Sequence, residues 1–334
     1  MAELRFDPIT GEWVVVAADR GSRPSDYPGS GSGVRVHGQD ACPFCPGNES
    51  MTPPEVMAVR DPGTAPNTPG WTIRVIPNKY PAFSPDLPFH PVSEGLYDLS
   101  PAFGIHEIVV ESPEDDLRMA DMDLLCLGNI LAVYRSRLKA IGETGKFAAA
   151  LIFRNYGKAA GASLSHPHSQ IVGIPVLPRL VAAELESFRA HLSETGQCLM
   201  CGLISQEIGE ADRVIIHRDG FLAYAPFPSG LPYQFRIVPT DHGENFQDSA
   251  DGDLAAFASV LKEALARLRN GLDDPPYNFI LHTAPFLSEG PYHWYLDVTP
   301  RITTTAGFEW GTGFCINTVS PEEGAAVLRD ADAK

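Results

Sequence analysis

The sequence predicts an α+β fold in which antiparallel sheets pack against helices, and three observations predict it. Short segments rich in Val, Ile and Phe alternate with loops rich in Gly and Pro, as strands joined by turns do. Longer segments carry apolar residues at helical spacing. The second half of the chain then runs through the same kinds of element in a similar order. Together these features favour a duplicated unit of mixed secondary structure.

The first half supplies most of the expected elements. Its helices should cover about Asp121–Ala140 and Pro178–Leu192. Its strands should lie at Glu12–Ala17, Thr72–Ile76, Glu107–Glu111, Phe147–Arg154 and Gln170–Ile174. The second half should contain a helix over about Asp253–Arg269 and strands at Arg213–His217, Gln234–Pro239, Tyr277–Thr283 and Trp294–Thr299.

One spacing links the two halves. The segment ALIFRN ends at Asn155 and the segment YNFILH ends at His282, and each end lies 11 residues before a histidine, His166 or His293. A duplication with halves 1–195 and 196–334 would produce this correspondence. Because strand–loop–strand arrangements are common, a coincidence of spacing is the alternative explanation.

Composition excludes some classes of function. The chain has 334 residues, of which 44% are hydrophobic and 20% charged, and its formal net charge is −17. That charge opposes nucleic-acid binding, which depends on clustered Lys and Arg. A mononucleotide in a cleft needs only a few basic groups and backbone amides. No apolar run is long enough for a bilayer and no signal peptide is recognisable, so we expect a cytoplasmic protein without a membrane partner.

Four of the six cysteines form two Cys-x-x-Cys pairs, Cys42/Cys45 and Cys198/Cys201. In a cytosolic protein such pairs indicate metal or redox groups rather than disulfides. Cys126 lies in a helical-looking stretch and Cys315 in the strand-like run GFCINTV. We expect these two cysteines to be small buried hydrophobic residues.

The segment NYGKAAGASLSHPHSQI, residues 155–171, concentrates chemistry between two expected strands. Its glycines let the backbone approach a ligand, and successive amides can cradle an anion. Pro167 favours an extended conformation at His166, so His166 and His168 should point to the same face. A neutral imidazole can attack phosphorus and leave again, which makes either histidine a candidate nucleophile and the other a candidate metal ligand. The alternative is a pair of exposed loop histidines, against which the accompanying polar residues and glycines argue.

The pattern Asn155-x-Gly157…Gly161-x-Ser163-x-x-His166-Pro167-His168-x-Gln170 resembles the active-site signature of the galactose-1-phosphate uridylyltransferases, a branch of the histidine triad superfamily. The segments RFDPITGEWVVVAADRGSRP, CPFCPGNE, RVIPNKYPAF and FGIHEIVVESP resemble further parts of that family, in the same order. The resemblance covers nearly the whole chain. It implies two histidine-triad-like halves, of which the second lacks the His-Pro-His motif and should be catalytically silent.

The resemblance also implies roles for individual residues. His168 would be the nucleophile, and Ser163 and Gln170 would donate hydrogen bonds to the transferred phosphoryl group. A structural Zn²⁺ would be bound by Cys42, Cys45, His106 and His166. Contacts with the nucleotide or its phosphates would come from Arg20, Arg23, Asn78, Asn155, Gly157, Ser163 and Gln170. Family members are commonly dimers, so a homodimer is implied as well.

Three departures set the chain apart from the best-known uridylyltransferases. Ser169 stands where the family usually has Gly. The second cysteine pair, with His242 and His293, could form a second Cys₂His₂ zinc site, a feature similar to the sister group that includes the plant ADP-glucose phosphorylases. Some members bind a second metal through Glu and His; Glu184 lies at the matching distance, but Tyr295 replaces one of those histidines. We therefore favour the cysteine pair and expect Glu184 to be a solvated helix residue.

Three functions are compatible with the sequence. The first is transfer of UMP between UDP-glucose and a hexose 1-phosphate, as in galactose metabolism. The second is phosphorolysis of an ADP-sugar such as ADP-glucose, with inorganic phosphate as acceptor. Both would proceed by a ping-pong mechanism through a nucleotidyl-histidine. The third is a nucleotide- or metal-binding protein with a vestigial site, with simple hydrolysis of nucleotide conjugates as an intermediate case.

Overall fold

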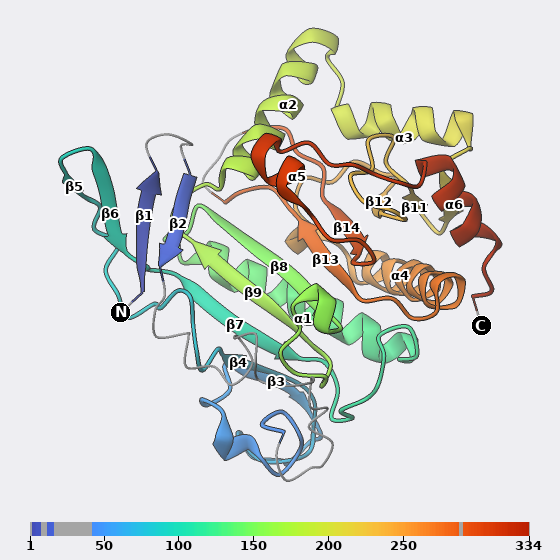
Figure 1. Ribbon diagram of the computed structural model, residues 1–334. Helices are drawn as coiled ribbons and strands as arrows, with labels where there is room; N and C mark the ends of the chain where they lie inside the picture. Colours follow the sequence, from blue (N-terminus) through green and yellow to red (C-terminus); the bar gives the residue numbers. More distant parts are fainter. Residues whose placement is uncertain (1, 8–11, 17–41, 287–289, 334) are drawn as a thin grey trace.

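Figure 1 shows the computed structural model of the chain, which describes residues 2–7, 12–16, 42–286 and 290–333. Its largest element is a ten-stranded sheet. The strands of this sheet are β3 (Met57–Arg60), β4 (Trp71–Pro77), β7 (Ile105–Val110), β8 (Ala149–Tyr156), β9 (His168–Ile174), β10 (Val214–Arg218), β11 (Phe221–Tyr224), β12 (Phe235–Pro239), β13 (Tyr277–His282) and β14 (Tyr295–Pro300). A smaller sheet contains β1 (Glu3–Asp7), β2 (Glu12–Val16), β5 (Val92–Glu94) and β6 (Tyr97–Pro101).

The large sheet has the strand order β10-β11-β12-β14-β13-β8-β9-β7-β4-β3. Its neighbouring strands pair in the antiparallel sense throughout. The halves meet where β8 pairs with β13, and this pairing sets Asn155 opposite Asn278. Outward from this pair, the strand order is β8-β9-β7-β4-β3 in the first half of the chain and β13-β14-β12-β11-β10 in the second half. Strands at the same step therefore occupy corresponding places in the order of the two halves along the chain. The division of the chain into units 1–195 and 196–334 remains a prediction.

Two long helices, α1 (Leu124–Glu143) and α4 (Asp251–Leu272), lie side by side against one face of the large sheet (Figure 1). Asp123 begins α1, because its carboxylate accepts the backbone N–H of Cys126 at 2.7 Å. The apolar stripes of both helices and the adjoining face of the sheet form the main hydrophobic core. The other α-helices are α2 (Arg179–Thr195), α3 (Leu199–Glu210), α5 (Gly307–Thr312) and α6 (Pro321–Asp330), and short 3₁₀ turns lie at Glu49–Met51, Lys158–Ala160 and Phe246–Asp248.

The predicted α+β class with antiparallel sheets is confirmed, and the predicted strands and helices are present with somewhat shifted ends. The prediction for Cys315 was wrong. The run GFCINTV forms no strand, because it connects α5 to α6 over the surface, and Cys315 is exposed. Cys126 lies in α1 as expected but is only partly buried. Within the described part of the chain, no helix combines the length and apolar character that crossing a bilayer requires.

Candidate active site and metal centres

His168 is the first residue of β9 and is almost completely buried. Its Nδ1 lies 2.8 Å from the carbonyl oxygen of His166. A carbonyl oxygen only accepts hydrogen bonds, so Nδ1 carries the proton and the lone pair of the neutral ring is on Nε2. The backbone therefore holds His168 in the tautomer whose Nε2 can attack an electrophile.

Ser169 points to the opposite face of β9 and is fully buried. Its Oγ lies 2.6 Å from the hydroxyl of Tyr134, which is also 3.0 Å from a carboxylate oxygen of Glu111. The Nε of Arg154 donates to Glu111 at 2.9 Å, and an Nη of Arg154 donates to Tyr277 at 2.9 Å. Burial and the charge of Glu111 raise the pKa of Tyr134 well above its ordinary value. This network fixes β9 on the face opposite His168, and no motif in the sequence indicates it.

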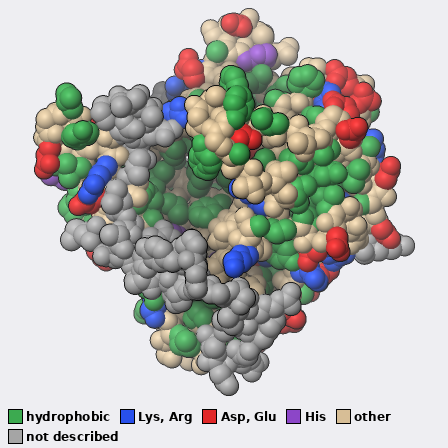
Figure 2. Space-filling model, in the orientation of Figure 1, with side chains coloured by type: hydrophobic (Ala, Val, Ile, Leu, Met, Phe, Trp, Pro, Cys, Tyr) green, Lys and Arg blue, Asp and Glu red, His purple; other side chains and the backbone are tan. Residues whose placement is uncertain are grey.

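A cavity of about 450 Å³ opens beside β8 and β9, on a face that Figure 2 shows to be hollowed and lined largely by hydrophobic side chains. Its polar lining residues are His106, Asn155, Gly161, Ser163 and Gln170, and its apolar walls are Ala82, Phe83, Leu151, Phe153, Val172, Ile174 and Pro178. The structure thus brings Asn155, Ser163 and Gln170 together, as the resemblance implied. Apolar walls with a few convergent polar groups are typical of small-ligand sites.

Three further residues were predicted to contact the nucleotide, and the structure describes one of them, Asn78. Asn78 is buried next to His106, with its Nδ2 3.0 Å from the Nε2 of His106. Arg20 and Arg23 lie outside the described residues.

The loop between β8 and β9 is supported by the second half of the chain. Gly157 has a φ of 80°, and a Cβ there would lie 3.0 Å from the Cβ of Pro276, so only glycine fits. The Nδ2 of Asn278 donates to the Oδ1 of Asn155 and to the carbonyl oxygen of Ala160, each at 2.8 Å. The conformation of this loop therefore depends on residues more than a hundred positions away.

A first cluster of candidate metal ligands contains Cys42, Cys45 and His166, all of which are buried. The Nδ1 of His166 lies 3.6 Å and 3.7 Å from the two Sγ atoms. Its Nε2 lies 2.7 Å from the carbonyl oxygen of Ser112, so Nε2 holds the proton and Nδ1 presents its lone pair to the thiols. Burial lowers the pKa of His166 and, with the neighbouring Cys42, raises the pKa of Cys45 to about 12. Two thiols and a neutral imidazole are donors that suit Zn²⁺.

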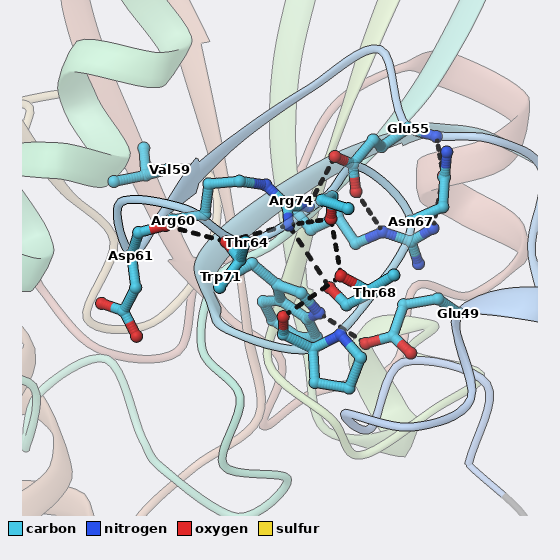
Figure 3. A network of polar contacts seen from close by, with 12 residues as sticks. Glu49, Glu55, Val59, Arg60, Asp61, Thr64, Asn67, Thr68, Trp71 and Arg74 are labelled. Carbon is cyan, nitrogen blue, oxygen red and sulfur yellow. Dashed lines mark hydrogen bonds and ion pairs between the residues drawn. The ribbon is translucent and has the colours of Figure 1, made fainter.

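The segment that carries this cysteine pair is tied to β4 by the polar network in Figure 3. The indole Nε1 of Trp71 donates to Glu49 at 2.8 Å, and the buried Arg74 donates to Glu55 and Thr52 at 3.0 Å and 2.8 Å. The side chain of Asn48 donates to the carbonyl oxygen of Cys42 at 2.9 Å. These contacts fix the turn that presents both cysteines to His166.

The prediction that His106 is a ligand of this cluster was wrong. His106 lies on β7 opposite Val172 of β9, whereas His168 pairs with Val110 at the other end of that ladder. The ligand atoms of the cluster lie within 4.8 Å of one another, and His106 is not among the residues that supply them. His106 instead lines the cavity, where its Nε2 is 2.8 Å from the Oε1 of Gln170.

A second cluster of candidate metal ligands contains Cys198, Cys201, His242 and His293, as the sequence suggested. The Nδ1 atoms of both histidines lie 3.6 Å from the Sγ of Cys201, and the Nδ1 of His293 is 3.9 Å from the Sγ of Cys198. The Nε2 of His293 lies 3.0 Å from the carbonyl oxygen of Pro239, which leaves the lone pair on Nδ1. Burial lowers the pKa of His293 to about 4, so the ring is neutral. Four converging donors of these types fit a closed tetrahedral zinc site.

The prediction that Glu184 is a solvated helix residue was wrong. Glu184 lies on α2 and accepts hydrogen bonds from the hydroxyls of Tyr292 and Tyr295 at 2.7 Å and 2.5 Å. The Nδ1 of His282 is 3.3 Å from the same carboxylate. Burial raises the pKa of Glu184, but the hydrogen bonds of His282, Tyr295 and Tyr292 outweigh it and lower the pKa to about 2. The sequence could not show that these groups converge.

Glu184→Gln is expected to reduce stability most at neutral pH. The carboxylate titrates near pH 2 in the folded protein against an ordinary value of 4.5, so its charge stabilises the fold above about pH 4.5. That stabilisation is lost as the pH falls from 4.5 towards 2. The difference in unfolding free energy between wild type and variant should be about 1–2 kcal/mol at pH 6, allowing for partial exposure, and should shrink below pH 4.5. Urea unfolding across this range measures it, and a difference independent of pH would contradict the assignment.

Comparisons with known proteins agree with this geometry. A family model described as galactose-1-phosphate uridyl transferase, N-terminal domain, matches residues 1–178, and a model of a domain of unknown function, DUF4921, matches residues 141–330. An ADP-glucose phosphorylase from Arabidopsis thaliana is 35% identical over 98% of this chain and 92% of its own length.

Two solved structures extend the similarity to the fold. A crystal structure of an ADP-glucose phosphorylase from Arabidopsis thaliana with bound ADP-glucose is 34% identical with a TM-score of 0.77, covering 99% of this chain and 100% of that one. A uridylyltransferase structure is 31% identical with a TM-score of 0.82, covering 98% of this chain and 97% of that one.

Proposed function

Because the chain belongs to the galactose-1-phosphate uridylyltransferase family and is a nucleotidyltransferase, we propose that it transfers a nucleoside monophosphate between sugar phosphates through a covalent bond to His168. The observation that carries this proposal is the tautomer of His168. Its Nδ1 donates to the carbonyl oxygen of His166 at 2.8 Å, so the nucleophilic lone pair is on Nε2 before substrate binds.

In the proposed mechanism, Nε2 of His168 attacks the α-phosphorus of a nucleotide sugar. The phosphorus–oxygen bond to the sugar phosphate breaks, the electron pair leaves with that oxygen, and sugar 1-phosphate is released. An oxygen of a second phosphate group then attacks the phosphorus of the nucleotidyl-histidine. The phosphorus–nitrogen bond breaks, and its electron pair returns to Nε2, which restores the neutral ring. Because phosphate monoesters are already anionic at neutral pH, this step needs no separate strong base. Ser163 and Gln170, which line the cavity, would donate hydrogen bonds to the phosphoryl oxygens.

Two pairs of substrates fit this mechanism. The family model favours UDP-glucose with a hexose 1-phosphate as acceptor. The 35% identity with an ADP-glucose phosphorylase favours an ADP-sugar with inorganic phosphate as acceptor. The two candidates share the nucleophile and differ in the base that the cavity accepts.

Intact-mass spectrometry after incubation with UDP-glucose or ADP-glucose, in separate reactions, tests the proposal. A gain of one UMP would support uridylyl transfer, and a gain of one AMP would support the ADP-sugar reaction. Adding a hexose 1-phosphate or inorganic phosphate should then discharge the adduct and identify the acceptor. Nucleotide binding without any adduct would contradict a covalent mechanism and support a binding protein.

We also propose that both cysteine clusters hold structural zinc. The second cluster supplies four ligands, whereas the first supplies Cys42, Cys45 and His166. The negative charge of Asp115 contributes an upward shift to the pKa of both Cys45 and His166. Asp115 is partly exposed in the loop after β7. The charge of Glu111 also contributes an upward shift to the pKa of His166, but Glu111 already forms an ion pair with Arg154. Since carboxylate oxygens are accepted zinc ligands, Asp115 is the candidate for the fourth position. Bound zinc would hold the loop that carries His168.

Metal analysis of purified protein is expected to give two zinc ions per chain. Cys42→Ser and Cys198→Ser should each lower this to one, because each removes a thiolate from a different site. His106→Gln should keep both ions, since His106 contacts Gln170 instead of the thiols. Chelator-resistant zinc measured by mass spectrometry provides the readout. Loss of one ion from the His106 variant would restore His106 as a ligand.

A homodimer is proposed as the assembly. The exposed side chains of Phe308, Trp310 and Phe314 form an apolar stretch in and after α5, which a partner subunit could cover. Sedimentation velocity would contradict this proposal if the protein remained at the mass of one chain at micromolar concentration.

A further inference from the structure

His106 is a buried histidine in the cavity that the proposed mechanism does not use. It lies on β7, on the same face of the sheet as Gln170 of β9. Building on the proposed function, we propose that His106 is a positioning residue that orients the side-chain amide of Gln170. It would turn the NH₂ group of Gln170 towards the phosphoryl group that His168 accepts.

The backbone determines which ring nitrogen of His106 carries the proton. The backbone N–H of Ala82 donates to the Nδ1 of His106 at 3.1 Å. A backbone N–H cannot accept a hydrogen bond, so Nδ1 presents its lone pair and the proton of the neutral ring is on Nε2. The opposite tautomer would place two N–H groups against each other at this contact and two acceptors against each other at the 2.8 Å contact between Nε2 and the Oε1 of Gln170.

The proton on Nε2 then fixes the amide of Gln170. The Nε2 of His106 lies 2.8 Å from the Oε1 of Gln170, and an N–H donor requires this oxygen as its partner. The two ends of an amide have opposite polarity, so binding the oxygen directs the NH₂ group away from His106. If the amide were reversed, its oxygen would face the phosphoryl oxygens and repel them.

Asn78 does not compete for this proton. The backbone N–H of Tyr80 donates to the Oδ1 of Asn78 at 2.9 Å, so the Nδ2 end of this amide faces His106. That nitrogen lies 3.0 Å from the Nε2 of His106, and because both atoms are donors in this tautomer, no hydrogen bond joins them. Of these two neighbouring amides, Gln170 alone offers His106 an acceptor. The backbone N–H groups of Ala82 and Tyr80 therefore determine which atoms of His106 and Asn78 donate hydrogen bonds and which accept them.

Nitrogen-15 NMR of histidine-labelled protein without substrate tests the first step. The ring signals of His106 are assigned as those lost in His106→Gln. We expect a pyridine-like shift for Nδ1 and a pyrrole-like shift for Nε2. The opposite pattern would overturn the proposal, whether or not the protein proves to be a nucleotidyltransferase.

Single-turnover nucleotidylation of His168 tests the second step, with whichever of UDP-glucose and ADP-glucose labels the wild type. His106→Phe keeps a ring of similar size without the donor and should slow labelling by about tenfold, since a preorganised donor becomes free to turn. The Kd of the corresponding nucleoside monophosphate should change by less than about threefold. His106→Gln should restore most of the rate, because its amide can donate to Oε1 of Gln170.

A double-mutant cycle separates positioning from an independent role. In a Gln170→Ala background, His106→Phe should cause no further loss of labelling rate. Losses that multiply would overturn the proposal, as would equal losses in His106→Phe and His106→Gln. Absence of any adduct in the wild type would instead refute the proposed function, and the NMR measurement would still decide the orientation of His106.

Discussion

His168→Asn is expected to lower kcat/KM for nucleotidyl transfer by roughly 10⁴-fold or more, as removal of a covalent nucleophile does. The Nδ2 of asparagine can replace Nδ1 of the ring and donate to the carbonyl oxygen of His166, which His168 contacts at 2.8 Å. The local fold should therefore survive. The amide offers no basic lone pair in place of Nε2, so no covalent adduct can form.

Stopped assays with the full set of substrates, together with intact-mass spectrometry, measure this effect. His217→Asn provides the matched control, because His217 is an exposed residue of β10, far along the chain from the site, and should retain wild-type activity. The Kd of a nucleoside monophosphate should stay within about threefold of wild type in both variants. Persistence of the adduct in His168→Asn would assign the nucleophile to another residue.

Arg154→Met is expected to reduce the free energy of unfolding by about 3–5 kcal/mol. Arg154 and Glu111 are both almost completely buried, and the Nε of Arg154 lies 2.9 Å from the carboxylate. Methionine fills much of the space of the arginine stem but leaves the charge of Glu111 unpaired in the interior. The same change removes a donor to Tyr277 and disturbs the contact of Tyr134 with Ser169, so activity should fall as well.

Urea unfolding of two further variants makes this prediction specific. Arg135→Met removes an ion pair with Asp251, whose side chain is 90% exposed, and should cost less than about 1 kcal/mol. The double variant Arg154→Met/Glu111→Gln should recover much of the loss, because glutamine removes the unpaired charge and can still accept a hydrogen bond from Tyr134. An effect of Arg154→Met no larger than that of Arg135→Met would contradict a strongly stabilising buried ion pair between Arg154 and Glu111.

The parts of the site that could be predicted from the sequence lie within short segments. His166 and His168 share a face because extended chain repeats every two residues, and a Cys-x-x-Cys turn places both thiols together. Local rules of this kind predicted the nucleophile candidate, both cysteine pairs and most strands of the large sheet. The donor types that suit zinc suggested His242 and His293 as partners of the second pair, and the structure brings both histidines to it.

The parts that could not be predicted depend on register between distant strands. His106 was assigned to the metal because a motif cannot show that β7 pairs with β9 in a register that places His106 beside Gln170. Glu184 likewise looked solvated, because its partners Tyr292 and Tyr295 lie more than a hundred residues further along the chain. The sequence predictions lack the short strands β1, β3, β5, β6 and β11 and the helices α3, α5 and α6, since short segments give weak periodic signals.

The pairing of β8 with β13 gives the second half of the chain a structural role beside the proposed site. Without the second half, β8 would become an exposed edge strand that invites association with other chains, and Asn155 would lose its contact with Asn278. The segment around β13 thus covers the edge of β8 and supports the loop between β8 and β9. Substitutions along β13 should therefore be tolerated less well than substitutions at exposed positions elsewhere in the second half of the chain.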